Sequence, residues 1–321
     1  MRYKANRNPG PLVGDFLKPT TLLYKAMNAT MDRKPPPPPT RRAELRLATT
    51  CGMDADTRAA LTALEALARS GSVAVAGGFM PDAGVRAHLA RLGVIEQVRE
   101  PDFFKFRHVV IPYSGIAPRD RKAWEEAEHA ITDLTSPHVR RAQVALGLLR
   151  MEGAQALVIG RHDDPETRAL AGTSAGTRII QDTTDTARLG YAPAFGVVCQ
   201  TTLSPRRVSW LLQQLRMRYR DARVTFLNTA TPAMAAREQA LEKLLDWCDA
   251  VVVVGQDGEA SVEALGEAAL RKGKPALVAA TPATFDPAAL AGARRIALTA
   301  GAFAQDAAIR AIYGAIKERR I

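Results

Sequence analysis

The chain has 321 residues, of which 47% are hydrophobic and 24% are charged. This is the balance of a soluble globular protein with room for two or three small domains. Its apolar runs are too short to span a bilayer, and its start lacks the continuous apolar segment of a secretory signal, so we expect neither. Three widely spaced cysteines indicate a reducing, cytoplasmic setting without a disulfide framework.

The net charge of +11 is concentrated near the start of the chain. Between Met1 and Arg46, ten Lys and Arg residues stand against three Asp and Glu residues, so seven of the eleven net charges lie there. No zinc-finger spacing or RNA-recognition signature accompanies them, which argues against nucleic acid. We expect residues 1–40 to form a basic N-terminal extension that ends in a polyproline linker and contacts a protein partner or a second copy of the chain.

Short apolar runs and amphipathic segments alternate through the rest of the chain. Strands are predicted within residues 44–50, 72–78, 108–115, 130–134, 156–160, 196–199, 223–227, 250–254, 275–281 and 295–301. Helices are predicted within residues 55–71, 84–93, 119–130, 136–153, 204–220, 235–247 and 259–273. This alternation is typical of βαβ units and parallel sheets, in which the loops after the strands bind ligands.

Several of those loops match one family in order and spacing. "CQTTLS" matches Q-T-T-L-S, "IGRHDDPE" matches I-G-H-x-x-H-P-E, and "DLTSP" matches D-A-T-C-P. "NTATPAMAAREQA" and "LTAGAFAQD" match D-T-I-C-x-A-T-x-x-R-Q-x-A and T-A-G-A-S-T-P-E. The chain therefore resembles the LytB family, the 4-hydroxy-3-methylbut-2-enyl diphosphate reductases.

The resemblance implies an α/β fold of three similar lobes with small, mostly parallel sheets, in pseudo-threefold arrangement around a central cavity. On this basis we expect the first lobe at 41–136, with the C-terminal segment 300–321 returning to it. The second and third lobes are expected at 137–226 and 227–299.

In the family, three cysteines hold an iron–sulfur cluster. Their positions fall on Asp54, Ser136 and Thr231 in this chain. Because such clusters need soft thiolate ligands, we expect no cluster and no other cofactor here. A divalent metal held by acidic loop residues is the alternative. Ser136, which precedes Pro137, also fits an ordinary helix cap.

The resemblance also implies a changed ligand. The family's diphosphate-binding histidines fall on Pro81, Ser114 and Asp164. Its Ser-Ser-Asn run falls on 259–261 and the serine of G-A-S-T-P-E on Phe303. Added carboxylates near the site would repel a diphosphate at close range.

Two residues of the family's proton chemistry are retained. Glu166 matches the glutamate that delivers a proton to the substrate hydroxyl, and Thr201 matches the threonine that contacts it. The alternative is that Asp164 and Glu166 both serve the start of the helix that follows Pro165. Arg161 fits an anion contact, or an ion pair with a neighbouring aspartate.

These observations predict Glu166 and Thr201 as catalytic residues. The predicted substrate contacts are Asp54, Ser114, Ser136, Arg161, Asp164, Gln200, Thr202, Thr231, Glu259, Ser261 and Phe303. The predicted function is a non-redox enzyme that performs dehydration, isomerisation or hydrolysis on a small polar or anionic metabolite. A non-catalytic ligand-sensing or partner-binding protein is the alternative, and an active diphosphate reductase is a weaker one.

Overall fold

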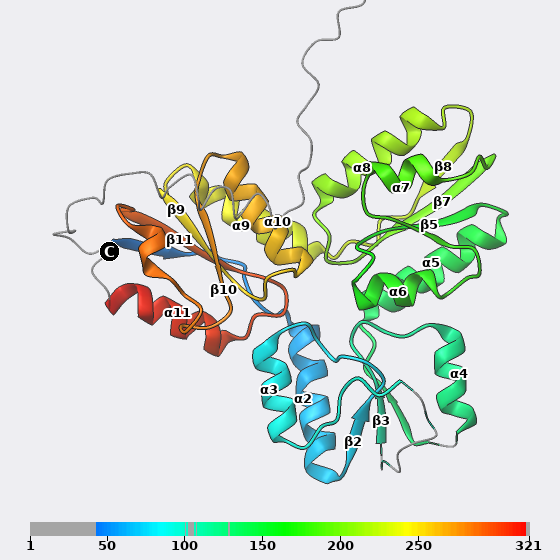
Figure 1. Ribbon diagram of the computed structural model, residues 1–321, viewed down its shortest axis with the longest axis horizontal. Coiled ribbons are helices and arrows are strands. Elements are labelled where there is room, and N and C mark those ends of the chain that lie inside the picture. Colours follow the sequence, from blue (N-terminus) through cyan, green and yellow to red (C-terminus); the bar gives the residue numbers. More distant parts are fainter. Residues whose placement is uncertain (1–42, 100, 102–105, 107, 128, 319–321) are drawn as a thin grey trace, which may run out of the picture. The chain divides into compact units, whose positions relative to one another are not determined.

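The computed structural model describes residues 43–99, 101, 106, 108–127 and 129–318. The predicted basic extension and polyproline linker, residues 1–40, lie outside these residues. The described chain forms three parallel β-sheets with helices packed on their faces (Figure 1), which confirms the predicted α/β class. Within the same residues, no helix is long and apolar enough to cross a membrane.

The first sheet has the strand order β2-β3-β4. Its strands are β2 (Val73–Val75), β3 (His108–Ile111) and β4 (Ile131–Asp133), and its helices are α2 (Ala55–Ser70), α3 (Ala83–Arg91) and α4 (Pro118–Glu126). The sheet is buried on both faces, because Val73 and Val75 share a core with Leu64 of α2 while Ala74 packs with Trp124 of α4. Alternate residues of one strand thus enter opposite cores.

The second sheet has the order β6-β5-β7-β8. Its strands are β5 (Gln155–Ile159), β6 (Arg178–Ile180), β7 (Ala194–Cys199) and β8 (Arg223–Phe226), and its helices are α5 (Pro137–Met151), α6 (Pro165–Ala171), α7 (Thr183–Arg188) and α8 (Pro205–Arg218). Leu157 packs with Leu211 of α8, whereas Val158 packs with Leu146 of α5.

The third sheet has the order β1-β11-β9-β10. Its strands are β1 (Glu44–Leu47), β9 (Ala250–Val254), β10 (Ala276–Ala279) and β11 (Arg295–Ala300), and its helices are α9 (Pro232–Leu245), α10 (Ala260–Arg271), α11 (Asp306–Glu318) and the short η2 (Pro287–Leu290). Val251 and Val253 meet α9 and α10, while Val252 and Val254 meet α11 on the other face. Figure 1 shows these helices on opposite sides of the sheet.

The three sheets share one pattern at their junctions. The edge strands β1, β4 and β8 pair with β11, β3 and β7 respectively. After each edge strand the chain enters a helix of another lobe, which is α2, α5 or α9. The N-cap residues of these helices are Asp54, Ser136 and Thr231. The three positions matched to the family's cluster cysteines are therefore equivalent places in the topology.

The sheet membership differs from the expected lobe boundaries in one respect. The boundaries placed residues 41–47 and 300–321 in the first lobe, but β1 pairs in parallel with β11 in the third sheet. α11 packs in the core of that same sheet through Ile309, Ile312 and Ile316. The reason is that pairing of distant strands, and not position along the chain, decides which sheet a strand joins.

Candidate active site

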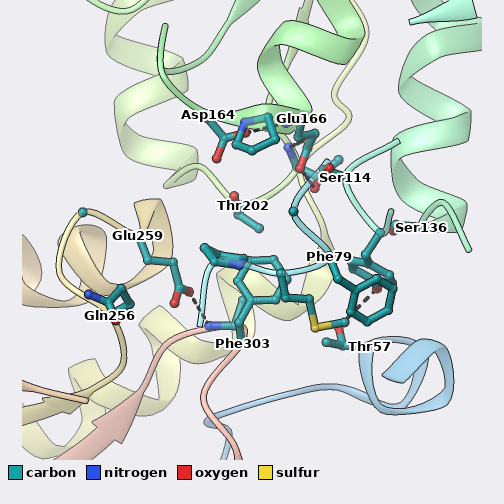
Figure 2. Close-up of a pocket in the computed structure, with 18 of the residues that line it drawn as sticks. Thr57, Phe79, Ser114, Ser136, Asp164, Glu166, Thr202, Gln256, Glu259 and Phe303 are labelled. Carbon is teal, nitrogen blue, oxygen red and sulfur yellow. Dashed lines mark hydrogen bonds between the residues drawn. The ribbon is translucent and has the colours of Figure 1, made fainter. Parts of the chain in front are cut away.

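A cavity of about 410 Å³ is lined by loops from all three lobes, and we call it the central pocket. Nearly all of its walls come from segments that follow the carboxyl ends of parallel strands, as expected for α/β sheets. Figure 2 shows Asp164 and Glu166 on one side of it and Glu259 on another. The lining residues are Asp54, Thr57, Gly78, Phe79, Met80, Pro81, Arg86, Gln97, Tyr113, Ser114, Ser136, Asp164, Pro165, Glu166, Thr201, Thr202, Thr231, Arg237, Gln256, Asp257, Gly258, Glu259, Ala302 and Phe303.

The three positions matched to cluster cysteines all line this pocket and all cap helices. Asp54 Oδ1 accepts from the backbone N–H of Thr57 at 2.9 Å. Ser136 Oγ accepts from the N–H two residues on at 3.3 Å, and Thr231 Oγ1 accepts from the N–H three residues on at 3.2 Å. Each side chain satisfies a first-turn donor that would otherwise lack a partner. The capping interpretation of Ser136 is thus confirmed, and the same residue also faces the cavity.

Asp164 and Glu166 have different roles, although they are two residues apart. Asp164 Oδ1 caps α6 by accepting from the N–H groups of Glu166 and Thr167 at 2.9 and 3.1 Å. The Glu166 carboxyl instead accepts from the N–H and the hydroxyl of Thr201, at 2.5 and 2.8 Å. The predicted catalytic pair is therefore in direct contact, and only Asp164 serves as the cap.

Burial raises the pKa of Glu166 to about 8, and the nearby Asp164 carboxylate adds to the shift. The hydrogen bonds from Thr201 act in the opposite direction but do not outweigh it. Glu166 is 7% exposed, so ionisation would leave a charge with little water around it. At neutral pH this carboxyl holds its proton, which suits it to act as a general acid.

Glu259 is a second buried carboxyl in the pocket. Its Oε1 accepts from the N–H of Ala302 at 2.9 Å and from the Ser261 hydroxyl, whereas Oε2 is buried and has no hydrogen-bond partner. Burial raises its pKa to about 7, despite those bonds and the nearby Arg237. A buried, unsatisfied oxygen in a pocket wall costs free energy unless a ligand or water meets it.

Arg86, Arg237 and Tyr113 line the pocket but were not among the predicted site residues. Arg237, from α9, is 2% exposed, and its Nε and Nη2 donate to the carbonyl of Gly52 at 3.2 and 2.7 Å. Tyr113 packs edge-to-face on Phe303 at 6.3 Å, which joins the first lobe to the loop after β11. The motif "REQA" could have identified Arg237 as a pocket residue. No local pattern predicts that Arg86 lines the pocket, because its position there depends on tertiary packing.

Three predicted contacts lie outside the central pocket. Gln200 is buried and accepts from the N–H of Arg161 and the hydroxyl of Thr167 at 3.2 and 3.1 Å, so it supports the wall. Ser261 is fully buried behind Glu259. Arg161 does not line this pocket, because its guanidinium pairs with Asp163 and Glu263. Of its two expected roles, the anion contact is therefore wrong for this pocket and the ion pair with a neighbouring aspartate is confirmed. These carboxylates satisfy the charge that was expected to hold a ligand.

The described side chains do not fit an iron–sulfur cluster. All three cysteines lie in the described part of the chain and none lines the central pocket. Cys51 packs against the core of the third sheet, Cys199 ends β7 in the core of the second, and Cys248 is buried beside α9 and α10. Burial raises the pKa of Cys51 and Cys199, which disfavours the thiolate form that binds iron. Among the described residues, no group of three or more His, Cys, Asp or Glu is placed to hold a metal ion.

The family is established by comparison with known proteins. The model of the family described as "LytB protein" matches residues 47–317, and this chain belongs to that family. Among its relatives, a 4-hydroxy-3-methylbut-2-enyl diphosphate reductase 2 of Burkholderia mallei is 29% identical over 191 residues, 59% of each chain. A 4-hydroxy-3-methylbut-2-enyl diphosphate reductase of Methylibium petroleiphilum is 29% identical over 207 residues, 64% of this chain and 63% of the relative. The sequence matches thus span about three fifths of these relatives' length.

Solved structures agree with the fold. The E-1-hydroxy-2-methyl-but-2-enyl-4-diphosphate reductase from Plasmodium falciparum superposes with a TM-score of 0.79 over 85% of this chain and 88% of that one, at 20% identity. A second structure, of (E)-4-hydroxy-3-methyl-but-2-enyl diphosphate reductase, gives a TM-score of 0.61 over 86% of this chain and 100% of that one, at 21% identity. At these identities the likeness concerns the fold alone, and it confirms the three-lobed architecture.

Proposed function

We propose that this LytB protein is a non-redox enzyme that moves protons on a small hydroxyl-bearing metabolite in the central pocket. The contact between the protonated carboxyl of Glu166 and the Thr201 hydroxyl carries the proposal. In it, Glu166 donates a proton to a leaving hydroxyl or to a developing anion, and Thr201 orients the reacting group. Dehydration, isomerisation and hydrolysis can each use such a donor.

Glu259 supplies a complementary group in this proposal. Its unpartnered Oε2 and its pKa of about 7 fit a carboxyl that accepts a proton while Glu166 gives one. Two carboxyls whose surroundings move their pKa values toward neutrality form a workable acid–base pair. The polar side chains of Asp54, Ser136 and Thr231 offer hydrogen bonds to the same ligand, where the family's thiolates would bind iron.

The test starts from the ligand. Native mass spectrometry of the full-length protein purified from cells identifies a bound metabolite, which is then incubated in D₂O without any electron donor. We expect deuterium incorporation or turnover in the wild type, and loss of it in Glu166→Gln but not in Glu242→Gln, an exposed residue of α9. Turnover that is unchanged in Glu166→Gln would refute the acid–base role. Stable binding without any reaction would favour the ligand-sensing alternative.

The names of the relatives favour a second candidate, reduction of 4-hydroxy-3-methylbut-2-enyl diphosphate. It is tested anaerobically with that compound and a reduced dye, after treatment of the protein with iron and sulfide. Our proposal expects no dye oxidation above the background without protein and no stoichiometric iron. Dye oxidation that depends on both protein and substrate would establish the reductase instead.

We also propose that the protein works in the cytoplasm, where its three free cysteines remain reduced. Fractionation of the native host, followed by detection of the chain in each fraction, tests this proposal.

A further inference from the structure

A second cavity, of about 590 Å³, adjoins the central pocket, and we call it the outer cavity. It lies between the loops that follow β2 and β3 in the first lobe and helix α6 of the second. Four residues line both cavities: Gly78, Gln97, Ser114 and Pro165. The two spaces therefore share a wall made of these four residues.

The two cavities differ in charge. Among its described lining residues the central pocket has five carboxyl groups against two guanidinium groups. The outer cavity has three arginines, Arg99, Arg119 and Arg168, against the single carboxylate Asp120. A molecule that spans both meets hydrogen-bonding carboxyls at one end and positive charge at the other.

Arg119 and Arg168 keep donors available for a ligand. Arg119 pairs with Asp120 at 3.3 Å, but both side chains are exposed, and such pairs contribute little free energy. Arg168 uses Nη1 to donate to the carbonyl of Asp163 at 2.8 Å. Because a guanidinium carries five N–H donors, its remaining donors are free to meet an oxyanion.

The shared wall contains a strained residue. Gln97 has a φ of +65° and is the non-glycine residue with positive φ in the described chain. Its N–H donates to the carbonyl of Gly77 at 2.7 Å, and its side-chain amide lies so close to Gly78 that a Cβ there would come within 2.7 Å of Nε2. Strained backbone of this kind concentrates where residues contact ligands.

We propose that the outer cavity is a subsite for the oxyanion end, carboxylate or phosphate, of a substrate whose hydroxyl end lies against Glu166 and Thr201. The assignment of the inner end rests on the proposed function. Of the positions matched to the family's diphosphate ligands, only Ser114 lines the outer cavity, so the anion is held by a different set of residues. The substrate class is then a small hydroxy acid or hydroxyalkyl phosphate.

The anion subsite is tested by titrating inorganic phosphate and succinate into the full-length protein at fixed ionic strength, with binding followed calorimetrically. We expect saturable binding that each of Arg99→Ser, Arg119→Ser and Arg168→Ser weakens by about fivefold, as for one partly solvated charge pair. The triple substitution is expected to abolish measurable binding. Tighter binding of phosphate assigns a phosphate end, and tighter binding of succinate a carboxylate end.

The matched control is a triple substitution that removes the same charge elsewhere: Arg216→Ser, Arg220→Ser and Arg310→Ser, which are exposed and line neither cavity. It should bind both anions as the wild type does. Equal binding by the two triple variants, or no saturable binding of either anion to the wild type, would overturn the subsite.

The span between the cavities is tested with hydroxyalkyl phosphates of increasing chain length. Affinity should rise at the chain length where the hydroxyl reaches Glu166 and Thr201, because the hydroxyl contact then forms within a molecule already bound through its phosphate. Thr201→Val should remove this gain and leave the binding of inorganic phosphate unchanged. The two proposals fail separately: turnover unaffected by Glu166→Gln refutes the acid–base function, whereas anion binding unaffected by the three arginine substitutions refutes the subsite.

Discussion

The buried Glu166 carboxyl predicts an unusual dependence of stability on pH. Its pKa is about 8 in the folded protein, against 4.5 for an ordinary glutamate. Between these values the native state holds a proton that the unfolded chain has lost. The contribution of this proton to the free energy of unfolding is therefore fully present below about pH 4.5 and is lost as pH rises through the folded pKa. Between the two pKa values it falls by about 1.4 kcal/mol per pH unit.

Glu166→Gln replaces the titratable carboxyl by an amide of similar size, so the native state no longer holds this extra proton. The free energy of unfolding, measured by urea denaturation with tryptophan fluorescence at a series of pH values, should then fall less steeply. Over the range from about pH 5 to about pH 8, the difference in the total decline between wild type and variant should approach 4 kcal/mol, as an upper limit. Glu259, with a pKa of about 7, contributes a similar slope that remains in the variant.

Glu242→Gln is the control, because Glu242 is exposed on α9 and its loss should leave the slope unchanged. Parallel curves for the wild type and Glu166→Gln would show that Glu166 ionises normally. In that case the carboxyl could not hold its proton at neutral pH, and the acid–base reasoning would be refuted.

Three further predictions concern the central pocket and the residues packed next to it. Thr201→Val should raise the pKa of Glu166 further, because it removes the hydroxyl that donates to the carboxyl at 2.8 Å and stabilises its charged form. Thr201→Ser keeps that donor and should keep the wild-type pKa. The infrared bands of the carboxyl, followed over a series of pH values, measure the change. Arg237→Met should lower the free energy of unfolding by roughly 2–4 kcal/mol, because its buried carbonyl acceptor loses two donors; a loss below about 0.5 kcal/mol in urea denaturation would contradict this. Gly160→Ala should lower the melting temperature by several degrees, since a Cβ would come within 2.8 Å of Cγ2 of the fully buried Thr167; an unchanged melting curve would show that the wall can yield.

Local patterns were enough to predict most of the fold. Continuous apolar runs such as 250–254 indicated buried parallel strands, and Ser136 before Pro137 indicated a helix start that the structure confirms. Two parts were not predicted. β6 with α7, at 178–188, has a short strand and a polar helix, so neither shows the apolar periodicity that identifies longer elements. α11, at 306–318, was also not predicted, although its buried residues Ile309, Ile312 and Ile316 recur at helical spacing.

The candidate site was predicted more unevenly. Asp54, Ser136 and Thr231 were expected in the pocket because the resemblance matches them to the family's cluster cysteines, and all three line it. For Arg161 the expected ion pair with a neighbouring aspartate is present, but the sequence does not show that Glu263, 102 residues away, also lies beside its guanidinium. Arg86 was missed because the residues around a helical arginine do not show whether its side chain faces solvent or lines a pocket.

The sequence by itself determined the parallel α/β class and the residues that start the helices around the pocket. It also determined that hydroxyl and carboxyl groups stand where the family has thiolates. The first two properties follow from side-chain chemistry and from periodicity within a few residues of each position, whereas the third follows from the resemblance to the family.

Only the tertiary structure decided which acid caps a helix and which faces Thr201, which sheet β1 joins, and where the outer cavity lies. Each of these depends on contacts between residues far apart in the chain. Burial of Glu166, which sets its protonation, is likewise a property of the packed lobes and not of the "DDPE" segment.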